Sequence, residues 1–233
     1  MSDAPHEEHG NNARTLNWLR AGVLGANDGI ISTAGLVIGV AAATTDRTAI
    51  FTAGMAGLVA GAMSMAVGEY VSVSTQRDSE KAQLALEKRE LAEMPEQELV
   101  ELAQIYEGKG LEPELAQEVA VALTERDALA AHADAELGID PDELTNPWHA
   151  AWASLIAFTL GALLPLLAIV LPPESWRVGV TGVSVLLALL LTGWISSGLG
   201  RSPRGPAIVR NVLGGFIAMV VTYGIGALVG TQI

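Results

Sequence analysis

Residues 150–171 have the sequence AAWASLIAFTLGALLPLLAIVL, an apolar run without a charged side chain. An α-helix rises 1.5 Å per residue, so about 20 apolar residues cross the hydrocarbon core of a bilayer. Four other runs in the chain are comparably long and apolar. The sequence therefore predicts an all-α membrane protein with five transmembrane helices, at residues 22–43, 50–72, 150–171, 178–199 and 207–230.

The composition of the whole chain agrees with a protein in the lipid bilayer. Hydrophobic residues make up 50% and charged residues 17%, and the mean hydropathy of +0.38 is too high for an ordinary water-soluble domain. The net charge of -13 opposes phosphate binding and excludes nucleic acid as a partner. The chain has no Cys, Walker loop, G-x-S-x-G or H-E-x-x-H motif, so we expect neither an enzyme nor a prosthetic group.

Most acidic residues are concentrated in one part of the chain. Residues 78–143 hold 19 of the 26 Asp and Glu residues but only five of the 13 Lys and Arg residues. This distribution predicts a polar N-terminal segment (1–20), two transmembrane helices (21–75), an acidic helical domain (76–146) and three further transmembrane helices (147–233).

The acidic domain is rich in Ala, Leu, Glu, Gln and Lys, which favour helices. Proline and glycine divide it into three helical segments that can form a small bundle. We predict a first helix that continues from the second span to Met94, a second at 96–107, and a third from Glu112 to Leu137.

Basic residues near the span ends predict the orientation, because Lys and Arg stay on the cytoplasmic side during insertion. If the N-terminus is cytoplasmic, only Arg47 and Arg177 fall outside, near Asp46 and Glu174 respectively. The acidic domain is then cytoplasmic and Ile233 is outside. The Ala- and Gly-rich composition and the short length favour a bacterial plasma membrane. The basic residues on the inner side are Arg14, Arg20, Arg77, Lys81, Arg201, Arg204 and Arg210.

A carboxylate lies within the first predicted span. Asp28 follows Asn27 and precedes Gly29. A charge at membrane depth is costly unless it is paired, protonated or in a wet cavity, so Asp28 is a functional candidate. Asn27 supplies a polar partner, and the glycine gives room for close backbone approach. The alternative is that the span ends are misplaced and Asp28 lies at the interface.

The second span offers a thioether and a carboxylate on one face. Met65 and Glu69 are spaced i, i+4, so both side chains can face the same cavity. The alternative for Met65 is packing, the commoner role of a lone Met in an apolar helix. Glu69 can also lie near the cytoplasmic surface, where a carboxylate is not informative.

Each helix of the acidic domain offers one pair of metal ligands. Oxygen-rich sites suit Mn²⁺ and Fe²⁺, and an imidazole improves the fit to later first-row metals. Spacing alone favours the alternative of a solvated acidic face. The pairs are Glu87 with Glu90, Glu98 with Glu101, and His132 with Glu136.

In combination, these features resemble the vacuolar iron transporter family, over about Trp18 to Val229. The motifs that carry the resemblance are Asn27-Asp28-Gly29-Ile30-Ile31-Ser32, Ala60-Gly61-Ala62-Met63-Ser64-Met65, Gly68-Glu69-Tyr70-Val71-Ser72, Glu87-Lys88-Arg89-Glu90, Pro95-Glu96-Gln97-Glu98-Leu99-Val100-Glu101 and Glu136-Leu137-Gly138. The order of these motifs along the chain is specific, although each alone is weak.

The resemblance implies a homodimer of five-helix protomers that exchanges cytoplasmic Fe²⁺, and also Mn²⁺, for protons across the bilayer. It implies that Asp28 and Met65 form a membrane metal site at the dimer interface. It further implies that the cytoplasmic domain collects metal through Glu87, Glu90, Glu98, Glu101 and Glu136.

The chain departs from the family pattern at two places. His132-Ala133 stands where some members have two Met residues, which leaves the ligand number and the preference for Fe²⁺ over Mn²⁺ open. Glu69 stands where some members have a small residue, and it is a candidate extra ligand or proton carrier. Two alternatives to transport are a membrane-tethered metal buffer or sensor, and a charged scaffold for partner proteins.

Overall fold

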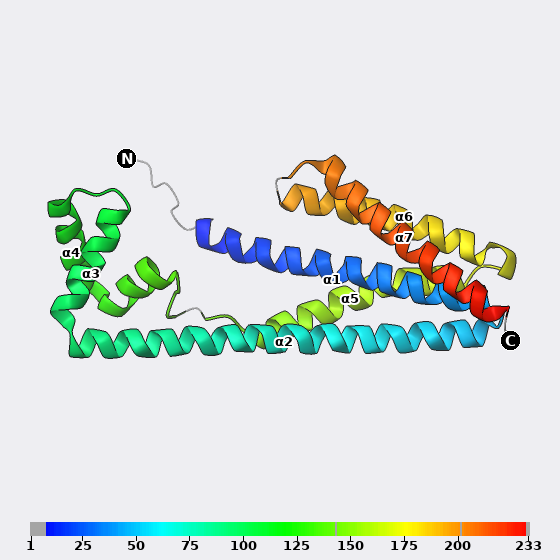
Figure 1. The fold of residues 1–233 in the computed structure, drawn as a ribbon, viewed down its shortest axis with the longest axis horizontal. Helices are drawn as coiled ribbons and strands as arrows, with labels where there is room; N and C mark the ends of the chain where they lie inside the picture. The colour runs from blue at the N-terminus through cyan, green and yellow to red at the C-terminus, as the bar shows by residue number, and fades with distance from the viewer. Residues whose placement is uncertain (1–7, 143, 201, 232–233) are drawn as a thin grey trace. The chain divides into compact units, whose positions relative to one another are not determined.

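The computed structural model describes residues 8–142, 144–200 and 202–231, with side chains described from Gly22 onward. Of the predicted polar segment 1–20, residues 1–7 therefore lie outside the described residues, and so does Ile233. Every regular element in the described part is a helix, and none is a strand (Figure 1). Its elements are α1 (Glu8–Ala43), α2 (Arg47–Glu93), α3 (Pro95–Gly108), α4 (Pro113–His132), the π-helix η1 (Ala133–Leu137), α5 (Pro147–Val170), α6 (Glu174–Leu199) and α7 (Arg204–Gly230).

Five helices are long and apolar enough to cross a membrane, which confirms the predicted all-helical membrane class. They are α1 from Gly22 to its end, α2, α5, α6 and α7. Several of these helices begin a few residues before the predicted spans, because hydropathy detects the apolar part of a helix and not its polar first turn. The chain divides into two compact units, unit 1 (Met1–Tyr70 and Trp148–Ile233) and unit 2 (Val71–Pro147).

Helix α2 is unbroken across its 47 residues, as its lack of an internal proline predicts. At 1.5 Å per residue it is about 70 Å long, more than twice the thickness of the hydrocarbon core. The boundary between the two units falls within α2, after Tyr70. The part of α2 that carries Glu87 and Glu90 belongs to unit 2.

The core of unit 1 forms around α1, which packs against α6 and α7. Ala34 and Val37 of α1 are fully buried, together with Leu189 of α6. The α1–α7 contact depends on glycine, because a Cβ at Gly226 would collide with the carbonyl of Gly39. Small residues of this kind let membrane helices approach closely, and each helix has a G-x-x-x-G pair, Gly35 with Gly39 in α1 and Gly226 with Gly230 in α7.

Two arginines tie the α1–α2 and α5–α6 connections of unit 1 together. Arg47 donates from Nη2 to the carbonyl of Pro172 at 3.0 Å. The buried Arg177 donates from Nη1 to the carbonyl of Thr45, also at 3.0 Å. Each connection thus supplies a backbone carbonyl that accepts a hydrogen bond from an arginine of the helix after the other connection. Asp46 and Glu174, which lie near the two arginines in the sequence, do not accept these two hydrogen bonds.

The third helix of unit 2 differs from the single helix predicted from Glu112 to Leu137. Within α4, Asp127 has non-helical angles (φ -165°, ψ 97°), and the last turn is the π-helix η1, which ends at Gly138 with φ 64°. Asp127 Oδ1 accepts a hydrogen bond from the Ala130 N–H at 3.0 Å. The aspartate therefore acts as an internal N-cap that restarts the helix, a competition between side chain and backbone that composition does not reveal.

Candidate metal centres

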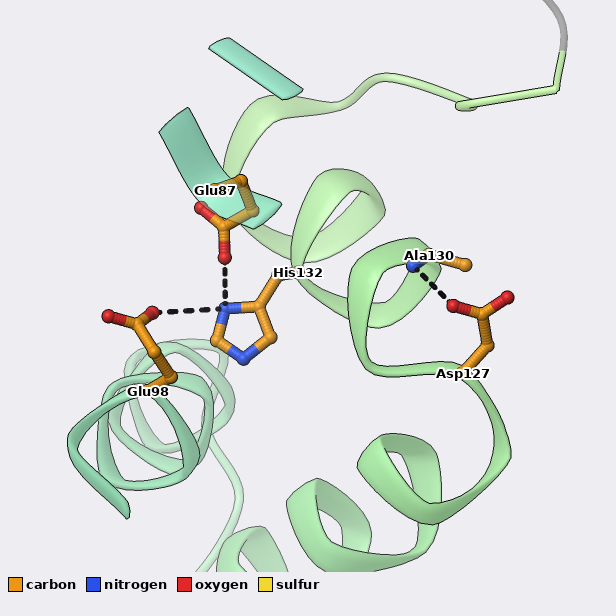
Figure 2. Close-up of polar contacts among 5 residues, drawn as sticks. All are labelled: Glu87, Glu98, Asp127, Ala130 and His132. Atoms are coloured by element: carbon orange, nitrogen blue, oxygen red, sulfur yellow. Dashed lines mark hydrogen bonds and ion pairs between the residues drawn. The ribbon is translucent and has the colours of Figure 1, made fainter. Parts of the chain in front are cut away.

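Three side chains from different helices converge in unit 2. Glu87 comes from α2, Glu98 from α3 and His132 from the end of α4, and Figure 2 shows the two carboxylates directed toward the imidazole. All three residues are buried, with exposed fractions of 4%, 5% and 0%. One ligand atom of each lies within 4.8 Å of the others. Two carboxylates and an imidazole at this separation are a ligand set for a first-row divalent cation.

The local sequence explains how α3 presents its carboxylate. Pro95 occupies the start of α3, where its missing N–H leaves no intrahelical bond unmade. Glu98 then falls in the first turn, one turn before Leu102, and the i, i+4 spacing sets both side chains on the buried face. Leu102 packs with Ala103 and with Ala120 of α4, so the small core of unit 2 holds Glu98 inward.

The break in α4 sets the direction of the imidazole. Ala120 is fully buried, and on a regular helix a residue twelve positions later is rotated by about 120° from it. His132 is nevertheless fully buried, because the chain restarts its helix at Asp127 and changes phase. The structural irregularity therefore serves to bring His132 to the two glutamates.

The contacts within the cluster are close but do not satisfy its polar atoms. His132 Nδ1 lies 3.0 Å from Glu87 Oε1 and 3.7 Å from Glu98 Oε2. Both imidazole nitrogens and Glu87 Oε1 are nonetheless buried without a well-formed hydrogen bond. Buried polar atoms rarely remain unpaired, because the loss of hydration is costly. A cation bound between these lone pairs would compensate that cost.

Burial and mutual repulsion favour neutral forms of these groups. Burial, and then repulsion by Glu136, Glu98, Glu90 and Glu101, raises the pKa of Glu87 to about 7. The pKa of Glu98 is also raised, first by burial. Burial lowers the pKa of His132 even though Glu136 and Glu101 act in the opposite direction.

These directions oppose a salt bridge at the 3.0 Å contact. A salt bridge would need a protonated imidazole and an ionised Glu87, yet the two shifts favour the neutral imidazole and the protonated carboxyl. We therefore interpret the contact as a pair of potential ligands and not as an ion pair. A neutral imidazole keeps a lone pair for metal, and a carboxyl with a pKa of about 7 binds metal in competition with a proton.

The remaining glutamates predicted in this domain surround the cluster without joining it. Glu90 is half-buried, whereas Glu101 and Glu136 are exposed. All three contribute to the repulsion that raises the pKa of Glu87, so they are close enough to attract a cation electrostatically. The structure thus brings together one member of each predicted pair.

A second candidate centre lies in unit 1. Asp28 of α1 and Met65 of α2 line one cavity of about 210 Å³, together with Ser32, Thr33 and Ser64. Sequence reasoning did not identify the three hydroxyl residues, although Ser32 lies one turn after Asp28 and Ser64 precedes Met65. Glu69 is half-buried and is not among the residues that line this cavity.

The neighbours of Asp28 have different roles from each other. A Cβ at Gly29 would collide with the backbone of Phe158, so the glycine gives room for close backbone approach, and the structure identifies α5 as the helix that approaches. Asn27 accepts a hydrogen bond on Oδ1 from Thr192 Oγ1 of α6 at 3.0 Å. This bond identifies Thr192, and not Asp28, as a hydrogen-bond partner of Asn27.

Comparison with known proteins gives one consistent result. The profile described as "VIT family" matches residues 19–227. A protein of Acanthamoeba castellanii named "Vacuolar iron transporter" is 41% identical over 95% of this chain and 82% of its own length. The "Vacuolar iron transporter homolog 4" of Arabidopsis thaliana is 37% identical over 94% of this chain and 88% of its own. The "VIT-like transporter 1b" of Glycine max is 38% identical over 92% of this chain and 77% of its own.

Proposed function

The chain belongs to the VIT family, and we propose that it is a transporter, not an enzyme, that moves Fe²⁺ out of the cytoplasm in exchange for protons. Mn²⁺ is proposed as a second cargo. The names of the relatives support iron transport, and the five apolar helices support a multi-pass membrane protein.

The observation that carries the proposal is the cavity shared by Asp28 and Met65. A carboxylate oxygen and a thioether sulfur combine a hard and a soft ligand, which suits Fe²⁺ better than Mg²⁺ or Ca²⁺. The two residues come from two membrane helices, α1 and α2, and line the same 210 Å³ space. Ionisable residues in membrane helices commonly line a cavity of this kind, where they mark an ion pathway.

Exchange for protons follows from the chemistry of the carboxylate. Metal and proton compete for the same oxygen lone pairs, so protonation of Asp28 weakens metal binding and metal binding releases a proton. We propose that this competition couples the two opposed flows. Glu69 is proposed as an additional proton carrier or metal ligand, since its half-buried side chain lies one helical turn beyond Met65.

We further propose that the protein is a homodimer in the lipid bilayer. The side of the cavity that holds Asp28 is open in the single chain, where Asp28 is exposed although it lies within a candidate membrane span. A charged group exposed to hydrocarbon would be very costly, and a second copy packed on this side of α1 removes the exposure. The proposed orientation places the N-terminus and the acidic domain in the cytoplasm and the C-terminus outside, in a bacterial plasma membrane.

The acidic domain is proposed to bind the cargo before it crosses. The buried group of Glu87, Glu98 and His132 would bind the cation, and Glu90, Glu101 and Glu136 would raise its local concentration. This buried group also favours a second candidate function, a membrane-tethered metal buffer or sensor, because binding alone requires no path across the membrane.

Fe²⁺ flux into proteoliposomes tests the transport proposal. We expect flux from the wild type under an imposed pH gradient and loss of most of that flux in Asp28→Asn, which keeps the shape but removes the charge. Asp46→Asn is the matched control, because Asp46 caps the Thr48 N–H at 2.8 Å outside the cavity and asparagine caps equally well. Absence of flux from a wild type that still binds metal would favour the buffer or sensor.

A further inference from the structure

Thr33 has a buried hydroxyl with no hydrogen-bond partner, in the membrane cavity that holds Asp28 and Met65. The residue is 2% exposed, and its Oγ1 is among the unpaired buried atoms. Thr33 also lines the cavity itself. A polar atom buried in a membrane helix is expected to find a partner, because hydrocarbon offers none.

Several other hydroxyls on the membrane helices hydrogen-bond to their own backbone. Ser32, next to Thr33, donates to the carbonyl of Asp28 at 2.7 Å. Such bonds to the preceding turn are the usual way in which Ser and Thr are accommodated in membrane helices. The hydroxyl of Thr33 makes no such bond to Gly29, one turn before it. Further bonds of this type join Thr159 to Leu155, Thr181 to Arg177 and Thr222 to Ala218.

We propose that the Thr33 hydroxyl is an oxygen donor to the divalent cation in this cavity, alongside Asp28 and Met65. The inference rests on the transport function proposed above and adds a residue to it. A water molecule occupies about 30 Å³ of liquid, so the 210 Å³ cavity has room for a cation and part of its hydration shell. Thr33 would replace one of the water ligands that the cation gives up.

The chemistry of a hydroxyl gives this position a specific effect. It adds a hard oxygen ligand without adding negative charge, so it favours Mn²⁺ and Fe²⁺ over softer cations without increasing competition by protons. Threonine in a helix also has two accessible χ1 rotamers. One rotamer can return the hydroxyl to the carbonyl of its own helix, so the ligand can be withdrawn when the cation leaves.

The competing interpretation is that Thr33 only fills space. In that case valine, which has the same shape, would replace it without effect on transport. A metal ligand predicts the opposite, because Thr33→Val removes the donor and Thr33→Ser keeps it. Thr159→Val is the matched control, since Thr159 lies on another membrane helix and its hydroxyl bonds to its own backbone.

The test is the concentration dependence of Fe²⁺ and Mn²⁺ flux in proteoliposomes. We expect the KM of Thr33→Val to rise about tenfold or more, while Thr33→Ser stays within about threefold of the wild type. Thr159→Val should not change the KM. The metal-free melting temperature of Thr33→Val should be no lower than that of the wild type, because the change removes no hydrogen bond. An unchanged KM and metal preference in Thr33→Val would overturn the inference.

A binding measurement separates failure of this inference from failure of the transport proposal. In full-length Glu87→Gln/Glu98→Gln/His132→Gln protein, the proposed unit 2 site is disabled and the membrane cavity remains. We expect Mn²⁺ to raise the melting temperature of this variant, and the added Thr33→Val change to reduce that rise. If the wild type shows no flux, the Mn²⁺-induced rise in melting temperature still tests the role of Thr33. The inference would be refuted if the added Thr33→Val change left this rise undiminished. It would also be refuted if Mn²⁺ caused no rise in the variant that retains Thr33.

Discussion

The imidazole Nδ1 of His132 lies 3.0 Å from Oε1 of Glu87, and neither atom has a well-formed hydrogen bond. Burial favours the neutral form of the imidazole, and the raised pKa of Glu87, about 7, means that its carboxyl takes up a proton as the pH falls below this value. The pair is therefore poorly stabilised by itself. A bound cation would convert its unpaired lone pairs into ligands, and this relationship underlies the first two predictions.

Replacing His132 should weaken metal binding by the full-length protein. His132→Gln removes the nitrogen ligand, and we expect the affinity for Mn²⁺ to fall by about 10- to 100-fold at the site in unit 2. Isothermal titration calorimetry of the detergent-solubilised protein measures this change. The control is His149→Gln, because His149 is exposed and lies outside the cluster. Equal affinities of the two variants would contradict the assignment.

Metal binding should strengthen as the pH rises through about 7. Below this pH, Glu87 holds a proton that the cation must displace, so the affinity should fall by up to about tenfold for each unit of decreasing pH. The same shift predicts the reverse trend for the stability of the metal-free protein. The pKa of Glu87 in the folded protein lies above its ordinary value of 4.5. The contribution of Glu87 to folding stability is therefore complete below pH 4.5 and is lost as the pH rises through about 7. Glu87→Gln should remove both contributions, as calorimetry and thermal unfolding between pH 5 and 8 would show.

A methyl group at Gly226 should destabilise unit 1. The added Cβ of Gly226→Ala would collide with the Gly39 carbonyl and force α1 and α7 apart, at a cost of about 1–3 kcal/mol. Gly224→Ala is the matched control, because a Cβ there meets no atom within 4 Å. Thermal unfolding in detergent should show a lower midpoint for the first variant alone. A Gly226→Ala midpoint equal to that of the control would show that the helices do not meet in this way.

The buried arginine between the two connections should also contribute to stability. Arg177→Met retains the apolar stem but leaves the carbonyl of Thr45 without this donor, and we expect a loss of about 1–3 kcal/mol. Arg210→Met is the control, because Arg210 is exposed and its Nε bonds to a carbonyl of its own helix at 3.3 Å. Unfolding monitored by circular dichroism gives both values, and an unperturbed Arg177→Met would contradict the proposed tie.

The helical membrane class could be predicted from the sequence because hydrocarbon imposes one simple requirement, a long apolar helix. The extent of α2 also followed from the absence of proline before Pro95. The break at Asp127 could not be predicted in the same way. An aspartate in an Ala-rich segment is compatible with a surface position on an unbroken helix, and only its bond to the Ala130 N–H identifies it as a cap.

The candidate ligands could be predicted from spacing only as pairs. The i, i+3 relation sets Glu87 and Glu90 on one face, but it does not determine which residue turns toward the neighbouring helices. In the structure Glu87 is buried with Glu98 and His132, while Glu90 is half-buried. Thr33 had no recognisable sequence signal. Its proposed role rests on a buried hydroxyl without a hydrogen-bond partner, which only the structure shows.

The most direct test of the exchange mechanism measures metal and proton movement in the same vesicles. Fe²⁺ uptake under reducing conditions would be followed together with a pH-sensitive dye inside proteoliposomes. The account predicts that Fe²⁺ entry raises the internal pH, because protons leave as the metal enters, and that Asp28→Asn abolishes both signals. Fe²⁺ entry without a change in internal pH, or undiminished exchange by Asp28→Asn, would contradict it.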